Sequence, residues 1–218
     1  DANGEIIAFI SQENRLPVTL ESISPYMIQA IIAMEDSRFY SHHGIDPVGM
    51  ARALYRNIIA RDVVEGGSTI TQQLAKNLYL DPRRTAGRKL EELVLAIQLE
   101  RKYTKNEILV MYLNEIYFGQ GAYGIEAASR TYFNKSAKDL GLAESAMLAG
   151  IPRAPSIYNP SVNPAAARER QVIVLDRMAE LGMIDENKAV QAKKQFLQPL
   201  KAPAQIMSAP YFTSEIIR

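Results

Sequence analysis

The fold is decided by the stretch that reads SPYMIQAIIAMED, residues 24–36 of a 218-residue chain. Ser24 and Pro25 form a favourable helix start, with the hydroxyl as the N-cap and proline at the first helical position. The residues that follow are apolar nearly all round the helix, so we expect this helix to be buried. It places Glu35, followed by Asp36, directly after five consecutive apolar residues.

The patterns that follow this stretch are also helical. On the helix expected at about 85–103, four apolar side chains (Leu90, Leu93, Val94 and Ile97) recur at the spacing of a core-facing stripe. A short strand is expected only within residues 6–10. Further helices are expected at about 48–61, from 66–68 to 78, after the capping box at 104–107, and at about 123–133, 142–149, 164–181 and 186–197. The sequence therefore predicts a mostly α fold.

The composition is that of an ordinary globular protein. Hydrophobic residues make up 47% and charged residues 22%, which excludes a largely disordered chain. The 25 basic and 24 acidic residues leave a net charge of +1, so the overall charge gives no indication of a nucleic-acid partner. Because there is no cysteine, disulfide scaffolds, thiolate metal sites and a cysteine nucleophile are excluded. No apolar run approaches the roughly 18–20 residues that a membrane span needs.

Glu35 is the first candidate for chemistry. Because it follows an apolar run at a helix end, its carboxylate is expected to be partly desolvated, with a raised pKa. Such a group can act as a general base or acid near neutral pH. The alternative is an ordinary acidic residue at a helix end that faces water.

The second candidate is the segment GGSTITQQ, residues 66–73. Paired glycines before a helix allow backbone N–H groups to approach a ligand, and the helix N-terminus favours an anion. The segment is no Walker-type phosphate loop, because no lysine follows at the required spacing. The alternative is an ordinary Gly-Ser helix cap with a polar face.

The third candidate is a cluster of basic residues. Residues 76–105 hold eight basic and four acidic residues, which gives a local balance of +4. Arg88 and Glu92 are four apart on the predicted helix and so share a face. The functional interpretation is a clamp for phosphate or pyrophosphate, with a carboxylate among the cations. The alternative is a set of solvated surface ion pairs that contribute little to the stability of the fold.

In order along the chain, these residues resemble the five motifs of the peptidoglycan glycosyltransferases, glycosyltransferase family 51. The resemblance covers roughly residues 20–182, with motifs at 35–44, 67–77, 88–92, 105–114 and 149–160, the last continued at 170–175. Enzymes of this family are the glycan-polymerising domains of class A penicillin-binding proteins and monofunctional enzymes. The resemblance implies a lysozyme-like, mostly helical domain with a large lobe and a smaller, membrane-facing lobe.

The resemblance also implies an inverting glycosyl transfer that polymerises lipid II. By that analogy, Glu35 deprotonates the 4-hydroxyl of the incoming GlcNAc unit, whose oxygen attacks C1 of MurNAc as polyprenyl pyrophosphate departs. Glu92 matches the family's second important carboxylate and is expected to support the pyrophosphate site. Asp36 and His42 match the first motif and are expected to orient the site. The side chains expected to contact or surround the substrate are Ser68, Gln73, Lys76, Arg84, Arg88, Lys89, Asp36 and His42.

No tightly bound cofactor is expected. A carboxylate and two phosphates offer Mg²⁺ the oxygen ligands that it prefers, which makes Glu92 a candidate ligand for a magnesium ion bound with the donor pyrophosphate. The expected partners are lipid II, the growing glycan chain and the bacterial membrane surface, and no nucleic acid. We expect the protein to act at the outer face of the bacterial cytoplasmic membrane, where an N-terminal helix outside this chain anchors it.

The chain is expected to divide into three segments. Residues 1–20 form an extended segment and residues 21–200 the glycosyltransferase domain. Residues 201–218 are the start of a linker towards a transpeptidase domain that this chain lacks. The apolar face of the helix at 48–61 suits either docking on a membrane or packing on the protein core.

Two other functions are compatible with a lysozyme-like fold. A muramidase or lytic transglycosylase also uses a glutamate at a helix end, but a neutral glycosidic leaving group needs no cluster of cations. A non-catalytic lipid-binding module has no need of both Glu35 and Glu92. Longer glycan chains made from lipid II would identify a glycosyltransferase, whereas shortened peptidoglycan would identify a muramidase or lytic transglycosylase.

Overall fold

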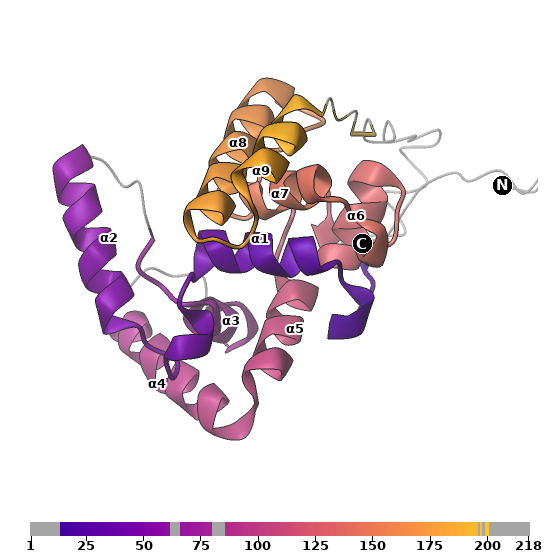
Figure 1. Ribbon diagram of the computed structural model, residues 1–218. Helices are drawn as coiled ribbons and strands as arrows, with labels where there is room; N and C mark the ends of the chain where they lie inside the picture. The colour runs from indigo at the N-terminus through magenta and orange to yellow at the C-terminus, as the bar shows by residue number, and fades with distance from the viewer. Residues whose placement is uncertain (1–13, 62–65, 80–85, 196, 198, 201–218) are drawn as a thin grey trace, which may run out of the picture.

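A computed structural model describes residues 14–61, 66–79, 86–195, 197 and 199–200 of the chain (Figure 1). This part is built almost wholly of helices, which confirms the predicted mostly α fold. The strand expected within 6–10 and the linker expected at 201–218 lie outside the described residues. The helices are α1 (Pro25–Glu35), α2 (Pro47–Ala60), α3 (Ile70–Tyr79), α4 (Ala86–Lys102), α5 (Lys105–Glu115), α6 (Ile125–Phe133), α7 (Leu142–Gly150), α8 (Pro164–Glu180) and α9 (Glu186–Lys194).

Shorter elements connect these helices. Single 3-10 turns lie at η1 (Leu20–Ser22), η2 (Phe39–Ser41) and η3 (Ala137–Asp139). Two strands, β1 (Asn14–Arg15) and β2 (Ala122–Tyr123), pair in parallel and bring the start of the described chain beside the start of α6.

The larger lobe is packed around α1. This helix lies against α7 and α8, and α5, α6 and α9 complete the lobe (Figure 1). Met27, Ala30 and Ile31 of α1 are fully buried, as the apolar sequence predicts. The capping box predicted before α5 is also present, with Thr104 and Glu107 each bonded to the other's backbone N–H.

The start of α1 differs from the prediction in one respect. The helix begins at Pro25 as expected, but the Ser24 hydroxyl does not cap it. Its Oγ donates instead to the carbonyl oxygen of Leu140 at 2.7 Å. The predicted cap is therefore wrong, because a hydrogen bond to the segment before α7 takes the hydroxyl.

The smaller lobe contains α2, α3 and α4, which lie to one side of the larger lobe (Figure 1). The core-facing stripe predicted on α4 is wrong, since Leu90 is 65% and Val94 54% exposed. The buried side of α4 carries Glu92, Ala96 and Leu99 instead. Helical periodicity identifies residues that share a face, but it does not determine whether another element covers that face.

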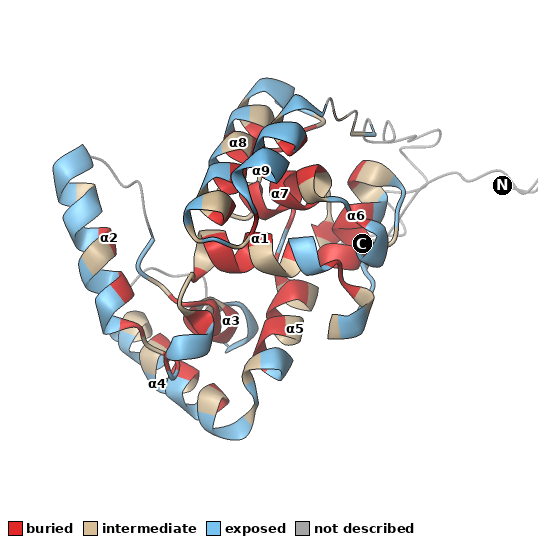
Figure 2. Cartoon of the chain, in the orientation of Figure 1, coloured by how far each residue is buried: buried red, intermediate tan, exposed pale blue. Residues whose placement is uncertain are grey.

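The apolar face of α2 is also open to solvent. Leu54, Tyr55, Ile58 and Ile59 are each more than 60% exposed, and most of α2 is coloured as exposed in Figure 2. Packing of this face on the protein core, one of the two alternatives, is therefore wrong. Among the described residues, no helix has the length and apolar character needed to cross a membrane.

The loop that follows α1 is held against the smaller lobe. Gly44 has a φ of +88°, and a Cβ at this position would lie 2.9 Å from the carbonyl oxygen of Ala96 in α4. The Thr69 hydroxyl donates to the carbonyl oxygen of Gly44 at 2.6 Å. Only glycine tolerates both the positive φ and the close approach. These contacts fix the position of the loop that carries Asp36 and His42.

Candidate active site

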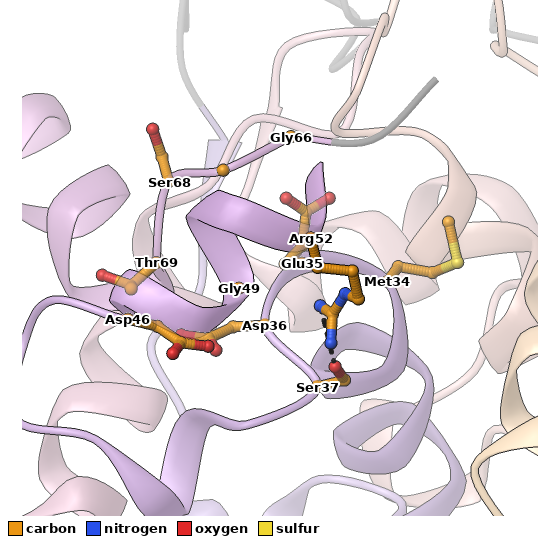
Figure 3. A pocket seen from close by; sticks show the side chains of 11 residues that line it. Met34, Glu35, Asp36, Ser37, Asp46, Gly49, Arg52, Gly66, Ser68 and Thr69 are labelled. Carbon is orange, nitrogen blue, oxygen red and sulfur yellow. Dashed lines mark hydrogen bonds between the residues drawn. The ribbon is translucent and has the colours of Figure 1, made fainter. Parts of the chain in front are cut away.

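A pocket lies where the end of α1 meets the start of α2 and the segment that precedes α3. Arg52 of α2 donates to the Ser37 hydroxyl at 3.4 Å across one side of it (Figure 3). Carboxylate, hydroxyl and guanidinium groups face this space, so it suits a polar ligand. The pocket is lined by Met34, Glu35, Asp36, Ser37, Asp46, Gly49, Arg52, Gly66, Gly67, Ser68 and Thr69.

Glu35 is the last residue of α1 and is half-buried in this pocket. Gln73 of α3 donates to it, with 2.8 Å between Nε2 and the carboxylate Oε2. Burial raises the pKa of the Glu35 carboxyl, and the hydrogen bond from Gln73 opposes that rise without cancelling it. The predicted desolvation of Glu35 is thus confirmed, and the alternative of an acid that faces water is wrong. A carboxylate in this state can accept a proton from a hydroxyl group.

The amide of Gln73 is held from its other side. Its Oε1 accepts a hydrogen bond of 3.2 Å from the hydroxyl of Tyr112, a fully buried residue of α5. With the carbonyl oxygen occupied by a donor, the NH₂ group must face Glu35. Three helices (α1, α3 and α5) therefore contribute one residue each to a chain of hydrogen bonds that ends at the candidate base.

Asp36 and His42 form the support behind the pocket. The Asp36 Oδ2 accepts from His42 Nε2 at 2.9 Å and from the backbone N–H of Ile70 at 3.1 Å. Ile70 is the first residue of α3, so this carboxylate lies at the positive end of the helix dipole. Asp36 and His42 thereby fix α3, and with it Gln73, relative to Glu35. This geometry supports the orienting role expected of both residues.

The segment at 66–69 precedes α3 and is not part of it. The expected helix start at 66–68 is wrong, because the helix begins at Ile70. Thr69 is the cap: its Oγ1 accepts from the Gln72 N–H at 3.1 Å, and Gln72 Oε1 accepts from the Thr69 N–H at 3.3 Å. This reciprocal pair is a capping box. It leaves Gly66, Gly67 and Ser68 outside the helix, in the pocket wall.

Three cations act on the carboxylate of Glu35. The positive charges of Arg170, Arg153 and Lys76 each lower the pKa of Glu35. Arg170 of α8 is 8% exposed and lies over the Tyr158 ring at 5.6 Å. Gly150 leaves room for it, since a Cβ there would lie 2.7 Å from the Arg170 side chain.

Two of these cations were missing from the residues expected at the site. Lys76 is among the expected residues, whereas Arg153 and Arg170 lie 77 and 94 residues further along the chain. They belong to the last motif, at 149–160 and 170–175, and that motif was the signal that could have identified them.

Glu92 is linked to the segment at 66–69 through Lys89. It is 3% exposed, and its Oε1 accepts from the ammonium of Lys89 at 2.5 Å. The same ammonium donates to the Ser68 hydroxyl at 2.9 Å and makes a longer contact of 3.4 Å with Gln72 Oε1. The basic cluster is thus no set of solvated surface pairs at this point, because one partner of the pair is buried.

The surroundings of Glu92 do not fit a metal ligand. The Lys89 ammonium occupies the Oε1 atom, and the Glu92 side chain is only 4% exposed, which leaves little room for a hydrated cation. Within the described part of the chain, no group of three or more His, Asp or Glu side chains is arranged to hold a metal ion.

The other expected phosphate contacts divide into two groups. Arg88 is described, half-buried on α4 one residue before Lys89. Arg84 lies outside the described residues. The structure therefore brings together side chains of the first three motifs around the segment at 66–69: Glu35 shares a pocket with this segment, and Glu92 is linked to it through Lys89.

Comparison with known families gives one match over most of the chain. The family model described as Transglycosylase matches residues 3–179. That range includes α1 to α7 and almost all of α8, and with them every side chain described above.

Several curated proteins are similar to the chain. Penicillin-binding protein 1F of Bacillus subtilis is 51% identical over 193 residues, which cover 88% of this chain and 27% of that protein. Penicillin-binding protein 1A of Escherichia coli is 46% identical over 218 residues, which cover 100% of this chain and 26% of that protein. The chain thus spans about a quarter of the length of these relatives.

A solved structure also resembles the whole fold. The crystal structure of penicillin-binding protein 1A from Haemophilus influenzae superimposes with a TM-score of 0.64 at 25% sequence identity. The match covers 99% of this chain and 22% of the larger one. The arrangement of helices described here is therefore that of one part of a longer protein in that structure.

Proposed function

This chain belongs to the transglycosylase family, and from that premise we propose that it is a peptidoglycan glycosyltransferase that polymerises lipid II into glycan strands. The observation that carries the proposal is the environment of Glu35. Its carboxylate has a raised pKa, is held in place by Gln73, and opens on a polar pocket. A base of that kind suits the removal of a proton from a sugar hydroxyl.

In the proposed reaction, Glu35 takes the proton of the 4-hydroxyl of the incoming GlcNAc unit. The oxygen forms a bond to C1 of MurNAc on the growing chain, and the bond from C1 to the phosphate oxygen breaks. The configuration at C1 inverts, and polyprenyl pyrophosphate leaves with the electron pair. Charge develops on the leaving group, so cations directed at it lower the barrier. Lys76, Arg88 and Lys89, with Arg84, are the proposed contacts.

Polymerisation of lipid II by the Glu35→Gln variant tests the proposal. Loss of a general base lowers the rate by roughly a hundred- to ten-thousand-fold. We expect long glycan chains from the parent protein and almost none from the variant, with circular dichroism to check that the variant is folded. Glu169→Gln, at an exposed position on α8, is the matched control and should keep full activity. Equal rates for Glu35→Gln and parent place the base elsewhere.

The same assay separates this function from hydrolysis of glycans. Gel analysis of the products shows longer chains for a polymerase and shortened peptidoglycan for a muramidase or lytic transglycosylase. A protein that binds lipid II without changing it is a binding module. Only the first result agrees with the proposal.

The exposed face of α2 is the proposed contact with the membrane surface, on the outer side of the cytoplasmic membrane. Its four large apolar side chains, together with Arg56, suit the interface of a bilayer that contains anionic lipid. We expect Leu54→Ser/Ile58→Ser to reduce co-sedimentation with phosphatidylglycerol vesicles. Ile173→Ser/Val190→Ser changes exposed residues of the other lobe and is the matched control. Unchanged binding by the α2 variant contradicts this part of the proposal.

The longer relatives indicate which other domains could accompany this one. Their names are those of penicillin-binding proteins, and this chain matches about a quarter of their length. We therefore propose that the domain acts together with a transpeptidase domain and is anchored by an N-terminal membrane helix.

A further inference from the structure

We infer that Glu92 is a positioning residue, whose buried carboxylate holds the Lys89 ammonium against Ser68 so that a fixed positive charge, and no metal ion, stands beside this residue of the pocket wall. This inference rests on the proposed function, because it assigns the charge to the leaving pyrophosphate. It concerns the side chains of Glu92 and Ser68 and the Lys89 ammonium that donates to both of them.

The first step is the difference in exposure between Glu92 and Lys89. The Glu92 side chain is 4% exposed, whereas that of Lys89 is 42% exposed. A nearly inaccessible carboxylate cannot itself meet a phosphate or a hydrated cation. The accessible member of the pair is the ammonium, so any contact with an anion is made by Lys89.

The second step is the direction in which the ammonium is held. Lys89 and Glu92 lie one turn apart on α4, while Ser68 belongs to the segment before α3. The ammonium therefore connects α4 to Ser68, a residue of the pocket wall. A lysine side chain is flexible, with four rotatable bonds, and without Glu92 the ammonium would keep only its neutral partners, Ser68 and Gln72.

The third step is the orientation of Gln72. This side chain is 1% exposed, and its Oε1 faces both the Thr69 N–H and Lys89, which leaves Nε2 buried with no hydrogen-bond partner among the described residues. An unpaired buried donor is unfavourable. The opposite orientation would turn that donor towards the ammonium, so the arrangement agrees with a cation permanently in place.

The test is the binding of inorganic pyrophosphate in a buffer that contains EDTA, measured by calorimetry. If Glu92 acted only through its negative charge, Glu92→Gln would tighten the binding of an anion. If it positions Lys89, the same variant weakens binding, by about tenfold or more. Glu91→Gln, the neighbouring and exposed glutamate on α4, is the matched control and should bind as the parent does.

A double-variant cycle tests the coupling. We expect Glu92→Gln/Lys89→Met to lose no more affinity than Lys89→Met alone, because Glu92 acts through the lysine. Losses that multiply in the double variant overturn the inference. Ser68→Ala removes one partner of the ammonium without changing any charge, and it replaces the lysine variants if these do not fold. We expect it to weaken binding about threefold, whereas unchanged affinity contradicts a positioning role.

Electron paramagnetic resonance of Mn²⁺ gives a readout that does not depend on activity. We expect Glu92→Gln to bind Mn²⁺ as the parent does, with or without pyrophosphate. Manganese bound by the parent and lost in Glu92→Gln overturns the inference, as does pyrophosphate binding that requires a divalent cation. Failure of the parent to polymerise lipid II would refute the proposed function alone, since neither binding measurement depends on turnover.

Discussion

Two helices, α1 and α4, each carry a glutamate of the candidate site, but their apolar residues lie in different surroundings. Those of α1 are buried against α7 and α8, whereas Leu90 and Val94 of α4 are more than half exposed. The α1 sequence is apolar nearly all round, whereas α4 carries seven charged residues besides its apolar stripe. Position adds to this difference, because α1 is central to the larger lobe and α4 lies at the edge of the smaller one.

The two glutamates differ in a corresponding way. Glu35 has an amide as its direct partner, and burial raises the pKa of its carboxyl. Glu92 has an ammonium as its direct partner. A carboxylate beside a neutral donor is suited to accept a proton, whereas one beside a cation is suited to hold that cation in place. The chemistry of each glutamate therefore depends on the side chain to which it is hydrogen-bonded.

The largest effect is expected where α1 and α4 are compared by truncation. Ile31→Ala in α1 removes a fully buried side chain and should lower the free energy of unfolding by about 2–5 kcal/mol. Leu90→Ala in α4 removes a side chain that is 65% exposed and should change it by less than about 0.5 kcal/mol. Urea unfolding of both variants measures the difference. A comparable loss for Leu90→Ala would mean that another element covers α4 in solution.

The sequence predicts the helices of this fold well, because each carries local signals that need no partner. The bounds of α1, α4 and α7 agree with prediction to within about one residue. The prediction that places the α4 stripe in the core is wrong, because Leu90 and Val94 have the correct spacing but no element of the described chain covers them. The Ser24 hydroxyl was assigned to a cap wrongly, because its partner, Leu140, lies more than 100 residues away.

The candidate site could be predicted only in part. The desolvation of Glu35 follows from five apolar neighbours in sequence, and that prediction is confirmed. The hydrogen bonds that hold it could not be derived, because Gln73 reaches Glu35 and Tyr112 reaches Gln73 only after α1, α3 and α5 have packed together. Lys89 was expected among the substrate contacts, but no local pattern indicates that its ammonium also joins Ser68 to Glu92.

The next effect concerns the amide beside Glu35. The hydrogen bond from Gln73 lowers the pKa of Glu35, so Gln73→Ala should raise that pKa further. A base must be deprotonated to act, and the acidic limb of the profile of kcat/KM against pH should therefore move to higher pH. Near neutral pH we expect a loss of roughly tenfold, which corresponds to about 1.4 kcal/mol.

The pH dependence of that loss separates this role from a structural one. Polymerisation rates from pH 5 to 9 should show Gln73→Ala approaching the parent at the alkaline end. A loss that is the same at every pH contradicts an effect on the pKa of Glu35. Gln98→Ala, at an exposed position on α4, is the matched control and should leave the profile unchanged.

The smallest effect compares the two glutamates by stability. The pKa of Glu35 is raised on folding, so its contribution to stability is present below the pKa of the unfolded state and is lost as pH rises through the folded value. Glu35→Gln, which cannot ionise, should therefore be more stable than the parent at pH 8, by about 1 kcal/mol or roughly 2–4 °C in Tm. At pH 4 the two proteins should unfold at nearly the same temperature.

Glu92→Gln should behave in the opposite way, since it leaves the Lys89 ammonium without its carboxylate and lowers Tm at pH 8. Thermal unfolding of both variants at the two pH values measures this contrast, and a Glu35→Gln variant that is less stable at pH 8 than the parent contradicts the desolvation of Glu35 on which its role as a base depends.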